Sequence, residues 1–181
     1  MNKIALFVFY FAFYFDVCGQ HNFPTPWLGS YEGIMQIENL SGVVDSVYTR
    51  LDFLAKEEKN HWTYRFTFKS EKWGEIINDY EMYWHDSLQS PNNFILDEHN
   101  GLFLNEQFVN KRFYGHYEVE DIHYTTLLQR LGEKLYFEIR CTDPKKGIKS
   151  NSIPDPQGAV FNVSTYYQFM LQHVLLSRIK I

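Results

Sequence analysis

The sequence predicts an all-β protein, a single up-and-down antiparallel β-barrel of about 8–10 strands. Apolar and polar residues alternate with a period of two through most of the chain, a pattern typical of half-buried strands. The alternating runs follow one another across short turns, so consecutive strands are expected to pair as neighbours. Aromatic residues make up 18% of the chain, and aromatic side chains favour strands.

The first nineteen residues have the organisation of a secretory signal peptide. Lys3 precedes an apolar run that is shorter than the roughly 20 residues needed to span a membrane. The small residues Val17 and Gly19 stand at the positions expected before a cut at Gln20. We therefore expect residues 1–19 to be removed and the protein to be exported to the periplasm or the extracellular space, with no transmembrane segment in the mature chain.

Cys18 raises the alternative of a lipidated N-terminus, but the Asp16 beside it does not suit a lipoprotein signal. We expect no lipid anchor on this residue. The mature chain then keeps one cysteine, Cys141, so an internal disulfide is excluded. Cys141 continues the alternation of Leu135, Phe137 and Ile139, which predicts a buried thiol.

Residues 20–181 are expected to form one domain, since no linker, repeat or low-complexity segment divides them. The clearest strand covers residues 62–68, and residues 75–84 are expected to pair with it antiparallel. Asn100-Gly101 predicts a two-residue hairpin tip.

Two C-terminal segments are harder to assign. Residues 143–157 contain three prolines and a glycine, which predicts a long exposed loop. The segment after Gly158 alternates but would also suit a helix. We favour a strand there, because a meander needs a closing partner for its first strand.

The inward positions of the predicted strands form an aromatic stripe, which has two interpretations. The side chains fill the barrel as core, as in small barrels, or they surround a cavity for an apolar or amphipathic ligand. Tyr and Trp carry polar tips that need partners, which favours a cavity of several hundred Å³, wet at one mouth, within the usual ~300–1,000 Å³ range. The candidate ligand-binding residues are Trp62, Tyr64, Phe66, Tyr80, Met82, Trp84, Phe113 and Tyr117.

Motifs for other chemistry are absent from the sequence. The seven histidines are scattered without metal-ligand spacing, although His116 and His123 are expected to meet across a hairpin. No nucleophile elbow or glycine-rich phosphate loop occurs, so we expect no metal, no cofactor and no enzymatic activity. The net charge of −5 and the lack of a Lys/Arg run argue against nucleic acid as a partner. We expect a monomer.

The segment Trp27-Leu28-Gly29-Ser30-Tyr31-Glu32-Gly33 resembles the opening strand of the calycin superfamily, which includes lipocalins and fatty-acid-binding proteins. Trp27 precedes Gly29, an order nearer to nitrobindin-like ten-stranded barrels. The 97–101 hairpin and the strand with Trp62 and Tyr64 are similar to uncharacterised secreted calycin-like proteins of Bacteroidetes. The resemblance implies a barrel, with Trp27 plugging one end, and a tendency to hold an apolar ligand.

Three functions follow from these observations. The first is a secreted or periplasmic protein that binds a small hydrophobic ligand. The second is an envelope-associated interaction or structural protein with a filled barrel. The third, implied by the nitrobindin resemblance, is a haem-binding protein with His173 as the axial ligand. We favour the first.

Overall fold

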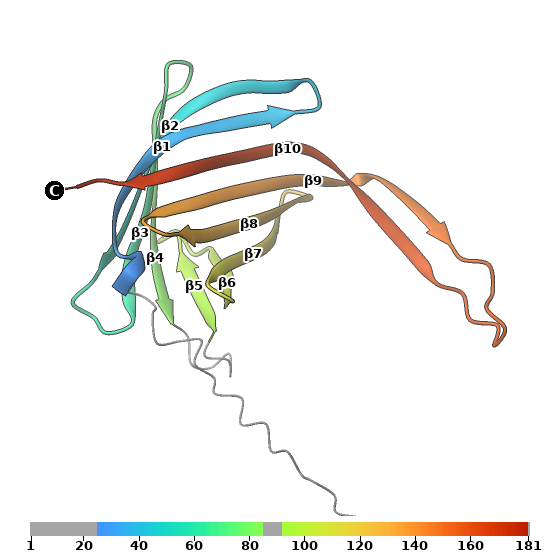
Figure 1. Ribbon diagram of the computed structural model, residues 1–181. Helices are drawn as coiled ribbons and strands as arrows, with labels where there is room; N and C mark the ends of the chain where they lie inside the picture. Colours follow the sequence, from blue (N-terminus) through green and yellow to red (C-terminus); the bar gives the residue numbers. More distant parts are fainter. Residues whose placement is uncertain (1–24, 85–91, 181) are drawn as a thin grey trace, which may run out of the picture.

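The computed structural model describes residues 25–84 and 92–180, which form one closed antiparallel barrel (Figure 1). The predicted signal peptide, Cys18 and the predicted cut before Gln20 lie outside the described residues. The elements are the 3₁₀ turn η1 (Thr25–Trp27), β1 (Gly29–Asn39), β2 (Gly42–Ala55), β3 (His61–Ser70), β4 (Gly74–Trp84), β5 (Asn93–Asp97), β6 (Phe103–Val109), β7 (Arg112–Val119), β8 (Ile122–Leu131), β9 (Lys134–Asn151) and β10 (Asn162–Arg178).

Each strand pairs with its neighbours in sequence, and β10 returns to pair with β1. The predicted all-β, up-and-down barrel is therefore confirmed, with ten strands in the described ranges. The last segment is a strand, as the need for a closing partner predicted. No helix in the described part of the chain is long and apolar enough to cross a membrane.

The pairing of β3 with β4 confirms the predicted register. Tyr64 lies opposite Tyr80, and Tyr64 and Phe66 are buried in the interior. Arg65, one residue along, forms a two-pronged ion pair with Asp79 on the outer face, with N–O distances of 2.7 and 2.8 Å. Successive side chains of a strand point to opposite faces, so the apolar alternation fixes which set faces inward.

The prediction of a loop over residues 143–157 is wrong for its first part. β9 continues to Asn151, and its end pairs with the start of β10 as a two-stranded arm that extends away from the barrel (Figure 1). The arm tolerates its Pro144 because an edge strand needs fewer backbone donors. Gly147 is required there, since a Cβ at this position would collide with the carbonyl oxygen of Thr165.

The prediction of a two-residue hairpin tip at Asn100-Gly101 is also wrong. Asp97 pairs with Phe103, which leaves five residues between the paired positions. Two side chains stabilise this longer turn. The Asp97 carboxylate accepts a hydrogen bond from the His99 backbone N–H at 2.7 Å, and the Asn100 side-chain oxygen accepts one from the Leu102 backbone N–H at 2.9 Å. Such side-chain turns compete with the shorter hairpin geometry.

One end of the barrel is closed by aromatic packing around Trp27. This side chain is 3% exposed, and its ring meets Phe108 and Phe113 edge-on at centroid distances of 5.9 and 5.4 Å. The Tyr31 hydroxyl donates to the Trp27 carbonyl oxygen at 2.9 Å. Trp27 therefore lies at the floor of the barrel.

Arg178, near the end of β10, holds the entering chain against this floor. Its guanidinium donates to the carbonyl oxygens of Pro26 and Leu28 and to the Tyr31 hydroxyl. It also stacks over the Tyr31 ring, 4.9 Å from the ring centroid. A residue from the last strand thus fixes the chain just before the first.

We expect Trp27→Ala to lower the free energy of unfolding by about 3–5 kcal/mol, because a large buried ring is replaced by a cavity. The control is Ile153→Ala, whose side chain is 87% exposed, and it should stay within about 0.5 kcal/mol of the wild type. Urea denaturation of both variants measures the difference. Equal losses would contradict the closed-end packing.

Candidate functional site

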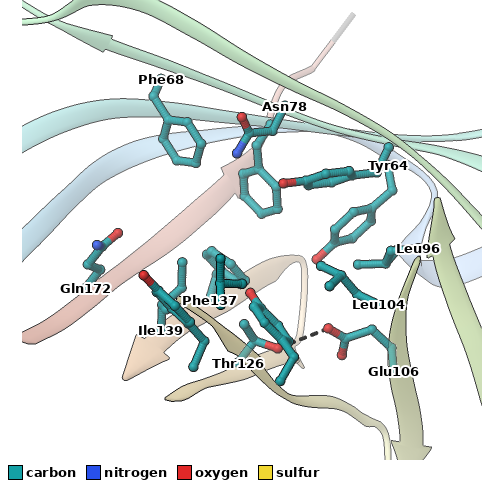
Figure 2. A pocket seen from close by; sticks show the side chains of 15 residues that line it. Tyr64, Phe68, Asn78, Leu96, Leu104, Glu106, Thr126, Phe137, Ile139 and Gln172 are labelled. Atoms are coloured by element: carbon teal, nitrogen blue, oxygen red, sulfur yellow. Dashed lines mark hydrogen bonds between the residues drawn. The ribbon is translucent and has the colours of Figure 1, made fainter. Parts of the chain in front are cut away.

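The half of the barrel away from Trp27 contains a cavity of about 210 Å³ (Figure 2). Side chains from seven of the ten strands, β3 to β9, line it, together with Gln172 from β10. Its apolar and aromatic lining is Tyr64, Phe66, Phe68, Tyr80, Leu96, Leu104, Tyr117, Val119, Tyr124, Phe137 and Ile139. Its other polar lining residues are Asn78, Glu106 and Thr126.

A second hollow of about 290 Å³ adjoins the first and shares Phe68, Asn78 and Gln172 with it. Trp73 and Ile76, from the β3–β4 hairpin, line this outer hollow. The inner cavity is smaller than the several hundred Å³ predicted from the sequence. The physical reason is that two inward rings, Phe66 and Phe137, meet in the interior with their centroids 4.6 Å apart.

The predicted ligand-binding residues divide by their depth in the barrel. Tyr64, Phe66, Tyr80 and Tyr117 line the cavity. Trp62, Met82 and Phe113 are buried in the packed core and do not line it. Trp84 is 37% exposed at the end of β4 and does not line the cavity, so the prediction for this residue is wrong.

Strand position explains this division. Alternation identifies the inward face, and Trp62, Met82 and Phe113 do point inward. Each of them, however, lies toward the end of its strand that is nearer the closed floor, where Phe113 packs against Trp27. The tilt and stagger of the strands, which set this depth, depend on pairing across the whole barrel.

The polar residues of the cavity were missed by the sequence reasoning, Glu106 above all. Glu106 lies on β6 between the inward positions of Leu104 and Phe108 and is 6% exposed. Its Oε1 accepts a hydrogen bond from the Thr126 hydroxyl at 3.0 Å. The signal was present in the sequence, since the alternation of Leu104, Glu106 and Phe108 puts a charged residue type at an inward position.

Gly115 makes room for this pair. It lies between Glu106 and Thr126 in the sheet, paired with Glu106 on β6 and with Thr126 on β8. A Cβ at Gly115 would collide with the Glu106 carboxyl oxygen and with the Thr126 hydroxyl. A glycine inside a strand commonly marks such a close approach.

Burial controls the ionisation of the cavity. Removal from water raises the pKa of Glu106 to about 8, and the hydrogen bond from Thr126 only partly opposes this rise. Burial also raises the pKa of Tyr80 to about 12 and those of Tyr64 and Tyr117 further above the usual value. At neutral pH the carboxyl group is therefore mostly protonated, and the cavity gains a negative charge above about pH 8.

The histidines in the described ranges lie away from the cavity. The rings of His116 and His123 do meet across β7 and β8, with centroids 5.7 Å apart. Their nitrogens bond instead to Thr125 (3.1 Å) and to Glu118 (2.9 Å). This outer pair offers no shared metal geometry among the described residues.

His173 does not occupy the place of an axial haem ligand. It follows Gln172, which lines the cavity, and its Nε2 lies 3.1 Å from a carboxylate oxygen of Glu38. Alternation along β10 therefore turns His173 away from the interior. The sequence-based haem hypothesis loses the one residue that supported it.

One cluster elsewhere has the composition of a cation site. Glu58, His61 and Glu81 bring ligand atoms within 4.8 Å of one another. The Lys56 ammonium already forms an ion pair with Glu81, and His61 Nδ1 hydrogen-bonds the same carboxylate. We interpret the cluster as an ion-pair network that joins the β2–β3 hairpin to β4.

Comparison with known proteins identifies a shared fold and no family. No family model matches the chain, and no curated protein matches it. Among solved structures, the chain is similar to an S-type phycobiliprotein lyase from Guillardia theta, with a TM-score of 0.53 and 7% sequence identity. The similarity covers 87% of this chain and 90% of the lyase. The two proteins therefore share a barrel fold. The likeness of this chain to calycins stays a resemblance.

We expect the stability of the protein to fall as pH rises from about 4.5 to about 8. Glu106 is protonated in the folded state up to about pH 8 but ionises in the unfolded chain near 4.5, so the unfolded state binds fewer protons in this window. The loss attributable to Glu106 approaches about 1.4 kcal/mol per pH unit. Glu106→Gln should remove this component, as measured by urea denaturation at several pH values.

The matched control is Glu71→Gln, which changes an exposed acid in a turn and should keep the wild-type pH profile. Identical profiles for Glu106→Gln and the wild type would contradict a buried, protonated Glu106.

Proposed function

We propose that this protein is an exported small-molecule-binding protein that holds an apolar or amphipathic ligand in its barrel. The observation that carries the proposal is the cavity itself, which has aromatic and aliphatic walls and a few fixed polar groups. Small-molecule sites in proteins combine these features. Export rests on the sequence of residues 1–19.

The arrangement of polar groups supports an amphipathic ligand. Glu106 and Thr126 lie deep in the cavity, whereas Asn78 and Gln172 lie where it joins the outer hollow. A bound molecule would meet apolar walls along most of its length and polar groups at its two ends (Figure 2).

A second candidate function has its own observation. The arm of β9 and β10 exposes large apolar side chains, among them Ile148, Phe161 and Tyr166. Exposed apolar clusters mark interaction surfaces in many proteins. An envelope-associated interaction protein would use this arm and would not need the cavity.

The test is binding of the apolar fluorescent probe N-phenyl-1-naphthylamine to the wild type and to Ile139→Trp. Ile139 lines the cavity, so the larger ring should fill it and lower the probe's affinity on the order of tenfold or more. Ile34→Trp is the control, since Ile34 is 55% exposed on the outer face of β1 and should leave binding unchanged.

Saturable binding that only Ile139→Trp weakens would support the ligand-binding function. If the wild type binds neither this probe nor the smaller one-ring probes used below, the ligand-binding function is overturned and the interaction protein is the better account.

A further inference from the structure

The cavity contains an acidic group without a basic partner. Its described lining includes no Lys, Arg or His, and Glu106 is its one carboxyl group. The hydrogen bond that Glu106 receives comes from a neutral hydroxyl, that of Thr126. A buried carboxylate is costly unless a cation or several donors compensate its charge. Glu106 avoids this cost while it stays protonated. Because the described lining offers no cation, a cation that pairs with the ionised carboxylate would come from the ligand.

The other side chains around Glu106 suit a cation as well. Tyr64 and Tyr117 face it from β3 and β7, and both rings belong to the cavity lining. Tyr80 adds a third ring. Aromatic faces attract organic ammonium groups, and rings gathered around a cavity are a common way to bind them.

A second acid, Glu98, lies beside the cavity wall. Glu98 lies in the β5–β6 turn, and its carboxylate interacts with the Tyr80 hydroxyl at the cavity wall. The whole chain carries a net charge of −5. A net negative charge favours the approach of a cation over that of an anion.

We propose, on the basis of the ligand-binding function above, that the preferred ligand class is a small primary amine with an aromatic ring. Its ammonium group would pair with the Glu106 carboxylate among the tyrosine rings. Its ring would pack against Phe137 and Ile139, which line the same cavity. The inner cavity of about 210 Å³ fits one ring with a short chain rather than a long lipid.

Binding of such an amine is coupled to a proton. In the empty cavity Glu106 is mostly protonated below about pH 8. A primary alkylammonium keeps its own charge up to about pH 10. Formation of the ion pair therefore releases the Glu106 proton to the solvent, and affinity rises with pH until Glu106 is ionised without the ligand.

The groups around Glu106 do not add a second titration in this range. The groups facing it, by element, are Tyr64 on β3, Tyr80 on β4, Leu96 on β5, Tyr117 on β7 and Thr126 on β8. Burial raises the pKa of each of these tyrosines, so all three stay neutral between pH 6 and pH 8. Cys141 on β9, whose thiol acts on Tyr117, also has a pKa raised by burial.

The test uses three probes of similar shape that differ in their head group: phenethylamine, 2-phenylethanol and 3-phenylpropanoate. Isothermal titration calorimetry on the mature protein between pH 6 and pH 8 measures their affinities. We expect phenethylamine to bind most tightly at pH 8, with an affinity that rises by up to tenfold per pH unit. Titration at pH 6 in buffers of different ionisation enthalpy should show one proton released.

Glu106→Gln keeps the shape of the side chain and removes its charge. We expect it to lower the phenethylamine affinity at pH 8 by about tenfold or more and to abolish proton release. Binding of the uncharged 2-phenylethanol should fall much less than that of phenethylamine, and Glu71→Gln should behave as the wild type in every titration. Proton release by the wild type tests the proposal even if Glu106→Gln fails to fold.

The outcomes separate this proposal from the function on which it rests. Equal affinities for the amine and the alcohol at pH 8, or an amine affinity that falls with rising pH, would overturn the amine assignment. The amine assignment would also be overturned if the protein binds N-phenyl-1-naphthylamine but not phenethylamine. If neither that probe nor any of the three binds, the ligand-binding function itself fails.

Discussion

The first and last strands of the chain meet, with Tyr31 opposite Arg178, and their backbone hydrogen bonds turn a ten-strand meander into a closed wall. Closure removes the sheet edges, which would otherwise pair with other chains. It also gives the inward side chains of all ten strands a common interior. The Arg178 guanidinium then ties this seam to Pro26 and Leu28, so that closure and the position of Trp27 depend on each other.

The two halves of the interior use inward residues differently. Near Trp27, rings pack edge-on and exclude solvent, which gives aromatic contacts their most favourable geometry. In the other half, polar side chains such as Asn78 and Gln172 replace further rings and leave space. The closely packed half therefore supports the half that contains the cavity, whose own lining packs incompletely.

Burial of Glu106 in the barrel lowers the free energy of unfolding at a pH where the free carboxyl group would be ionised. Its burial disfavours ionisation, and the sheet accommodates the carboxyl only because Gly115 carries no side chain and Thr126 donates a hydrogen bond. A leucine at this position would pack better in an apolar interior. Glu106 is the one acid in the described cavity lining, and that lining holds no basic partner for it, which is why this residue, and not the more abundant tyrosines, directs our ligand proposal.

Local alternation along the chain was enough to predict which face of each strand points inward. The alternation of Tyr64 and Phe66 with Arg65 predicted the inward side correctly, and the need for a closing partner predicted β10. The depth of a side chain in the barrel could be read only from the fold. Tyr80 and Met82 share a face, yet Tyr80 lines the cavity and Met82 lies in the packed core. The reason is that alternation is a local property with a period of two, whereas depth follows from strand stagger, which long-range pairing sets.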